Sequence, residues 1–278
     1  MRPTSRAVLA ALCLACLVAP TLAAQSAADA RGLYSAAETR RVAEDWYGAI
    51  EGYLAALAKN PSYSEAMVGL AECYYALGEY DQALSYIKKA SPLRRGDTAL
   101  GNLEGFVRIG LEDVEGAKAL FAAVQSAKPN DLDARFGLAL LDLAAGRKSD
   151  ARTRLEESLR ISPQNARALL SLSLIAADQG READAEALME QALRFHGGEA
   201  RVQYTAARLS AQAGDLDKAI FHARNAVQQD ASMSAARLLL ASLLYESASY
   251  AEAMAIMQEG VAKDRRNSGA WYTLGLAQ

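Results

Sequence analysis

The segment Met67–Ala90, MVGLAECYYALGEYDQALSYIKKA, carries two helical patterns separated by a short turn at Gly78. Before the glycine, Leu70, Ala71 and Tyr74 fall on one helical face, and a second apolar face follows after it. Glycine adopts the left-handed conformation that ends many helices, so Gly78 predicts the end of the first helix. The segment is therefore predicted to be a helical hairpin, which needs neighbours because one hairpin cannot bury both of its sides.

The hairpin pattern recurs with a period of 34 residues. Alanine occurs at this spacing without interruption at Ala49, Ala83, Ala117, Ala151, Ala185, Ala219 and Ala253. A second column holds only small residues, namely Ala37, Ala71, Gly105, Ala139, Ser173, Ala207, Ala241 and Gly275. Small side chains let two helices cross closely. A bulky column fills the space beside them and is interrupted only by Ala223: Tyr53, Ile87, Phe121, Leu155, Met189 and Met257.

One repeat shows a recurrent family pattern especially clearly: Leu70, Ala71, Tyr74, Gly78, Tyr80, Ala83 and Ala90, with prolines near other repeat ends at Pro61, Pro129 and Pro163. In these residues the chain resembles the tetratricopeptide repeat family. The resemblance covers residues 30–278, although Glu44 and Glu112 replace the turn glycine. It implies an all-α fold, a right-handed α-solenoid of stacked antiparallel helix pairs.

Seven repeats are predicted over residues 30–267, after a short lead at residues 25–29. Residues 268–278, SGAWYTLGLAQ, are predicted to begin an eighth, truncated repeat, because Trp271, Leu274 and Gly275 match the start of the family pattern. A solenoid usually closes with a polar cap, so we expect more repeats or another domain beyond Gln278.

Residues 1–24 are predicted to be a cleaved secretory signal peptide. Arg2 and Arg6 precede an apolar run at residues 7–19, and the small residues of Thr21–Ala24 suit a signal peptidase. Export to the periplasm or cell envelope is the expectation. An outer-membrane lipoprotein anchored through Cys16 is the alternative, since residues 12–16 loosely resemble a bacterial lipobox.

The exported chain would keep a single cysteine, Cys73, so no disulfide within the chain is expected, and this thiol is predicted to pack in the core. The net charge of −3 offers no basic stripe for nucleic acid. His196 and His222 lack companions at metal-ligand spacing, and no glycine-rich phosphate loop follows a strand. We therefore expect a non-catalytic protein that uses no cofactor, no metal and no nucleic acid.

The resemblance implies that repeat positions 2, 5, 9, 12 and 13, on the first helix of each hairpin, line a concave groove. From the third repeat onward these positions are largely apolar. The predicted groove residues are Asn102, Phe106, Ile109, Phe136, Leu140, Leu143, Leu170, Leu174, Tyr204, Arg208 and Leu238, with Asp133, Arg167, Asp178 and Arg201 at the rim. Alternatively, the leucines pack on adjacent first helices or are covered by a further part of the protein.

Two functions are compatible with this pattern. The favoured one is a protein–protein interaction scaffold of the cell envelope, which binds a partner peptide or helix in an apolar groove and supports complex assembly. The other is the docking domain of a larger enzyme or of a secretion or transport component. No repeat carries the Lys and Asn pair with which some family members hold a free peptide carboxylate.

Overall fold

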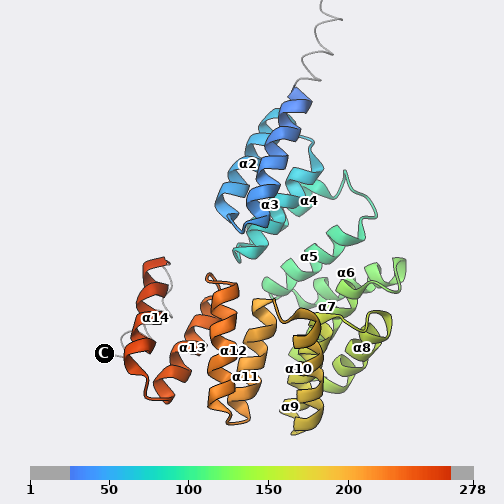
Figure 1. Ribbon diagram of the computed structural model, residues 1–278. Coiled ribbons are helices and arrows are strands. Elements are labelled where there is room, and N and C mark those ends of the chain that lie inside the picture. Colours follow the sequence, from blue (N-terminus) through green and yellow to red (C-terminus); the bar gives the residue numbers. More distant parts are fainter. Residues whose placement is uncertain (1–25, 264–278) are drawn as a thin grey trace, which may run out of the picture. The chain divides into compact units, whose positions relative to one another are not determined.

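The computed structural model describes residues 26–263, which form helices joined by short turns without a strand among them (Figure 1). A first helix covers residues 26–42 and so includes most of the predicted lead. The prediction of an all-α fold is confirmed. The predicted signal peptide, Cys16 and the predicted eighth repeat lie outside the described residues. The further helices are α2 (Trp46–Lys59), α3 (Ser64–Ala76), α4 (Tyr80–Ala90), α5 (Thr98–Gly110), α6 (Val114–Ala127), α7 (Leu132–Ala144), α8 (Lys148–Ile161), α9 (Ala166–Asp178), α10 (Glu182–His196), α11 (Ala200–Gln212), α12 (Leu216–Gln229), α13 (Ser234–Glu246) and α14 (Tyr250–Lys263).

The chain divides into two compact units at Leu141 and Asp142, within α7. In the N-terminal unit α3 pairs with α4 and α5 with α6, while α2 contacts α3 and α4 contacts α5. In the C-terminal unit the pairs are α9 with α10, α11 with α12 and α13 with α14, and each pair also contacts the next (Figure 1). First helices of neighbouring hairpins touch as well: α3 with α5, α9 with α11, and α11 with α13.

The turn inside the hairpins keeps one backbone conformation whichever residue occupies it. A positive φ recurs every 34 residues at Glu44 (58°), Gly78 (74°), Glu112 (61°), Gly146 (74°), Gly180 (70°), Gly214 (79°) and Ala248 (60°). A residue with a Cβ atom is strained in this region by about 1–2 kcal/mol. Glu44, Glu112 and Ala248 nevertheless adopt it, because the packing of the two helices fixes the path of the turn.

Short polar side chains begin many of the helices. Asp97, for example, accepts hydrogen bonds from the backbone nitrogens of Ala99 and Leu100 at the start of α5. Such a cap satisfies donors that the first helical turn leaves without a partner. Equivalent side-chain caps are made by Asp45, Asp113, Asn165 and Asp215.

The core of the N-terminal unit is shaped by contacts between aromatic rings and glycines. The Phe121 ring on α6 is fully buried. A Cβ atom at Gly105 on α5 would lie 2.6 Å from two atoms of this ring, and one at Gly137 on α7 would lie closer still. In the same way, Gly69 on α3 leaves room for the buried ring of Tyr53. Helices of successive repeats approach closely here because the facing residue has no side chain.

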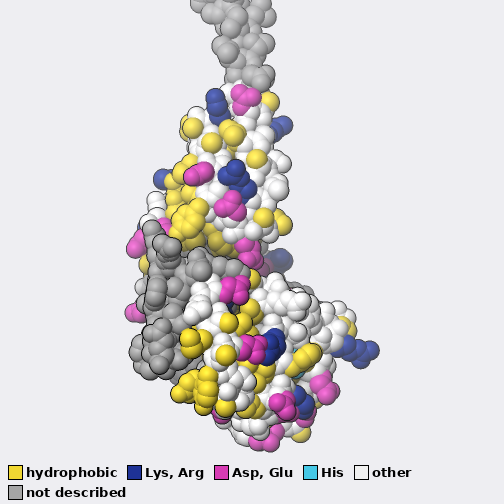
Figure 2. All heavy atoms as spheres, turned by 60° about the vertical axis from the view of Figure 1, so that its left-hand side comes forward, with side chains coloured by type: hydrophobic (Ala, Val, Ile, Leu, Met, Phe, Trp, Pro, Cys, Tyr) yellow, Lys and Arg dark blue, Asp and Glu magenta, His cyan; other side chains and the backbone are white. Residues whose placement is uncertain are grey.

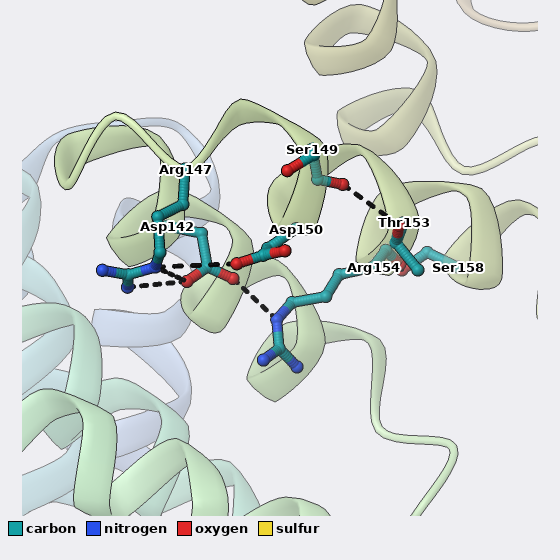
Figure 3. A network of polar contacts seen from close by, with 7 residues as sticks. All are labelled: Asp142, Arg147, Ser149, Asp150, Thr153, Arg154 and Ser158. Carbon is teal, nitrogen blue, oxygen red and sulfur yellow. Dashed lines mark hydrogen bonds and ion pairs between the residues drawn. The ribbon is translucent and has the colours of Figure 1, made fainter.

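In the C-terminal unit a carboxylate joins the last turn of α7 to α8 (Figure 3). The Asp142 side chain is 9% exposed and accepts hydrogen bonds from Arg147 at 2.8 Å and from Nε of Arg154 at 2.8 Å. Burial alone raises the pKa of Asp142, but the hydrogen bonds from Arg154 and Arg147 outweigh burial and hold the pKa below its usual value. The family pattern favours tyrosine at this repeat position, so an ionic contact replaces aromatic packing here.

Candidate partner-binding surfaces

The predicted groove residues lie on the first helices of the hairpins, and each unit has its own set. We call these sets the N-terminal first-helix surface (Asn102, Phe106, Ile109, Phe136 and Leu140) and the C-terminal first-helix surface (Leu143, Leu170, Leu174, Tyr204, Arg208 and Leu238). Figure 2 shows one face of the molecule, on which hydrophobic side chains gather in several groups with acidic and basic side chains between them.

In the N-terminal unit, apolar side chains form a stripe that is only partly exposed. The Phe106 ring lies 5.0 Å from the buried Phe121 ring and 6.4 Å from the Phe136 ring, measured between centroids. Phe106 and Ile109 pack against the core with one side. Phe136 and Leu140 are half-buried. The stripe therefore contributes both to the core and to the accessible surface.

Asn102 belongs to the interior rather than to this stripe. It is 4% exposed, and its Nδ2 donates a hydrogen bond to Oδ1 of Asp131 at 2.8 Å. The same oxygen accepts from the backbone nitrogens of Asp133 and Ala134, which caps α7. Burial alone raises the pKa of Asp131, but the Ala134 and Asn102 hydrogen bonds lower it below its usual value. Asn102 thus ties α5 to the start of α7.

A charged cluster on the first two repeats was not foreseen from the sequence. Arg41 forms ion pairs with Glu38 at 2.8 Å and with Glu72 on α3 at 3.3 Å, and the Tyr53 hydroxyl donates to Glu38. Burial, together with the nearby Glu38 carboxylate, raises the pKa of Tyr34 to about 12. Glu38 and Glu72 occupy the same repeat position, so the spacing of 34 residues could have identified them as neighbours.

In the C-terminal unit the surface combines apolar side chains with arginines. Leu143, Leu174, Tyr204 and Leu238 are half-buried, whereas Leu170 is 6% exposed and belongs to the core. The Arg208 guanidinium lies 5.9 Å from the centroid of the Tyr204 ring.

The predicted rim residues differ in their surroundings. Arg167, Asp178 and Arg201 are exposed, and Asp133 is half-buried. Asp178 forms an ion pair with Lys148 on α8, so its charge is offset within the unit.

The remaining reactive side chains are engaged in the fold. Cys73 is fully buried, and burial raises the pKa of its thiol to about 12, so it stays protonated and unreactive near neutral pH. Burial lowers the pKa of His222, whose Nδ1 lies 2.8 Å from Oε1 of Gln203. Within residues 26–263, no three His, Cys, Asp or Glu side chains cluster in a way that could hold a metal ion. None of the described helices combines the length and apolar character needed to cross a membrane.

Solved structures with a similar fold are proteins of the same repeat class. The crystal structure of TTC0263, a thermophilic TPR protein from Thermus thermophilus, is 24% identical over 66% of this chain and 99% of that chain, with a TM-score of 0.60. A tetratricopeptide repeat protein from Parabacteroides merdae ATCC 43184 is 14% identical over 90% of this chain and 98% of that chain, with a TM-score of 0.62. The pilF protein of Pseudomonas aeruginosa is 16% identical over 78% of this chain and 99% of that chain, with a TM-score of 0.54.

The sequence itself matches the family model described as "Tetratricopeptide repeat" over residues 43–105, 108–171, 149–209 and 210–277. These segments cover most of the chain. Together with the helix pairs that recur every 34 residues, they show that this protein belongs to the tetratricopeptide repeat family.

Proposed function

We propose that this protein is an exported, non-catalytic scaffold of the cell envelope, which binds a peptide or helix of a partner protein on apolar side chains of its first helices. Tetratricopeptide repeats generally serve as non-catalytic scaffolds for protein partners. The observation that carries the proposal is the stripe of Phe106, Phe136 and Leu140, which leaves part of its apolar surface accessible where a purely solvated helix face would be charged.

The proposed compartment rests on the leader sequence. If the leader is cleaved, mass spectrometry of the protein from its native envelope will find a mature chain that begins at Ala24 or Gln25. A mature chain that begins at a diacylated Cys16 would instead support the lipoprotein alternative. A chain that retains Met1 and stays in the cytoplasm would contradict export.

Partner binding is tested by the double variant Phe136→Gln with Leu140→Gln. Phe106 is left unchanged because its ring packs on the buried Phe121. If the stripe binds a partner segment, the double variant will recover at least about tenfold less partner from envelope extract than the parent chain, because two apolar contacts at an interface typically contribute this much. Recovered proteins are quantified by mass spectrometry, and the fold is checked by far-UV circular dichroism.

The matched control is Leu54→Gln with Leu93→Gln. Both leucines are exposed apolar residues of the same unit, at 41% and 51%, but lie outside the first helices. Equal recovery by the parent chain and by the Phe136→Gln, Leu140→Gln variant would reject the proposed surface, as would an equal loss in the control.

A further inference from the structure

One face of α11 in the C-terminal unit carries a stripe of two arginines with a tyrosine between them. Arg201, Tyr204 and Arg208 follow each other at intervals of three and four residues, so they lie on the same side of the helix. Both arginines are exposed, and the Tyr204 ring is half-buried. The seven-residue step from Arg201 to Arg208 corresponds to a rise of about 10 Å along the helix.

These two guanidinium groups differ from most arginines of the unit in having no carboxylate partner. Among the described residues, neither Arg201 nor Arg208 forms an ion pair, and Arg208 contacts only the Tyr204 ring through its charge. Other arginines of the unit are paired: Arg147 and Arg154 with Asp142, Arg152 with Glu156, Arg181 with Asp184, and Arg224 with Glu252. The stripe therefore offers two planar hydrogen-bond donors to an incoming acceptor.

Carboxylates close to the stripe in the sequence are already engaged. Glu199, which precedes α11, lies 2.8 Å from Nδ1 of His196, and Asp215, which follows α11, accepts from the backbone of Lys218 and pairs with its ammonium group at 3.1 Å. Neither offsets the positive charge of the stripe through a direct contact.

Apolar side chains flank the stripe on the neighbouring first helices. Both α9 and α13 contact α11. Leu238 on α13 occupies the same repeat position as Tyr204, and Leu174 on α9 occupies the same position as Arg208, and both leucines are half-buried. The stripe thus combines positive charge at two points with an apolar middle and apolar neighbours.

We propose that the C-terminal first-helix surface binds an acidic amphipathic helix, whose two carboxylates lie seven residues apart and meet Arg201 and Arg208. Apolar side chains between the two acids pack on Tyr204, Leu174 and Leu238. This inference rests on the proposed function, because it names the chemistry of the partner for one of the two surfaces. Charge complementarity carries it: two accessible arginines at a separation of about 10 Å match acids at i and i+7 of a helix.

The test uses two fluorescein-labelled helical peptides of about 18 residues, long enough to form a helix. One has Glu at i and i+7 with Leu at i+3 and i+4, and the other has Gln in place of both Glu residues. We expect the exported chain to bind the Glu peptide about tenfold more tightly than the Gln peptide at about 50 mM salt, measured by fluorescence polarisation. The preference will shrink at about 300 mM salt because screening weakens exposed ion pairs.

The double variant Arg201→Gln with Arg208→Gln is expected to abolish the preference for Glu over Gln. Its matched control is Arg160→Gln with Arg194→Gln, which removes the same charge from exposed arginines of the second helices α8 and α10. Arg194 also stacks on a ring, Phe195, at 5.7 Å, as Arg208 does on Tyr204. The control is expected to keep the preference.

Equal binding of the two peptides, or an equal loss of preference in both double variants, would overturn the inference. Equal binding of both peptides that is weakened by Leu238→Gln would also overturn it, but would leave the proposed function intact, because apolar capture would remain. Failure of both peptides to bind would reject the acidic helix as the occupant, whereas the proposed function is decided separately by recovery of partners through Phe136 and Leu140.

Discussion

Replacing Phe121 with alanine is expected to lower the free energy of unfolding by about 4 kcal/mol, the range typical of a large cavity in a packed core. The ring is fully buried between α5 and α7, and it contacts the backbone faces of Gly105 and Gly137. Neither glycine has a side chain that could move into the space. Urea unfolding followed by far-UV circular dichroism measures the loss.

The same contact makes the facing glycine intolerant of a side chain. Gly137→Ala places a methyl group within the Phe121 ring, which cannot retreat because Gly105 approaches it from α5. We expect a loss of about 2 kcal/mol from overpacking. Combining Gly137→Ala with Phe121→Leu should cost clearly less than the sum of the single changes, because the smaller side chain makes room for the methyl group.

Gly32→Ala is the control for these changes. Gly32 lies within the helix of residues 26–42, and a Cβ atom there meets nothing within 4 Å. The substitution should raise stability by up to about 1 kcal/mol through helix propensity. Additive effects of Gly137→Ala and Phe121→Leu would show that the ring and the glycine do not form one packing unit.

Neutralising Asp142 by Asp142→Asn is expected to cost about 2 kcal/mol at pH 7. The carboxylate is 9% exposed and joins Arg147 and Arg154, so the variant leaves two arginines without their shared anion (Figure 3). The expected loss is smaller than for a fully buried pair because both arginine side chains are partly exposed, by 48% and 35%.

The contribution of Asp142 should disappear in acid. Because the pKa of Asp142 in the folded protein lies below that of the unfolded chain, about 3.9, its stabilisation is complete above that value and is lost as the pH falls through the folded pKa. Urea unfolding of the parent and of Asp142→Asn should therefore differ at pH 7 and converge at about pH 2. A difference that is unchanged between these pH values would show that the charge is not responsible.

Asp150→Asn provides the matched control. Asp150 lies 3.8 Å from Arg147, but its side chain is 59% exposed. An exposed ion pair contributes little, so a change below about 0.5 kcal/mol is expected at pH 7. An equal loss in both variants would assign the effect to general surface charge rather than to the buried carboxylate.

The bulky column contains a sequence relation that was overlooked, although it could have been found. Its two aromatic members are each followed sixteen positions later by glycine, Tyr53 by Gly69 and Phe121 by Gly137, whereas the small Ala223 is followed by Leu239. The structure shows why for the aromatic members, since each ring packs on the glycine of the next repeat. Comparing columns of residues between repeats, rather than each column alone, would have identified this pairing.

The period of 34 residues by itself determined the helical hairpins and the places where they turn. Alanine and glycine columns specify close helix crossings, and these constraints act within one repeat or between adjacent repeats. The period even placed Glu44 and Glu112 at turn positions, where the structure has a positive φ despite the missing glycine. Local spacing was sufficient because each hairpin contacts mainly its neighbours.

Only the tertiary structure decided which first-helix side chains remain accessible. Asn102 and Leu170 occupy the same repeat position as Phe136 and Leu238, yet they are buried while the latter are half-buried. The ion pairs of Arg41 and the absence of any for Arg201 and Arg208 among the described residues likewise depend on side chains brought together by folding. The physical reason is that exposure and charge pairing are set by neighbours in space, which a repeat position alone does not specify.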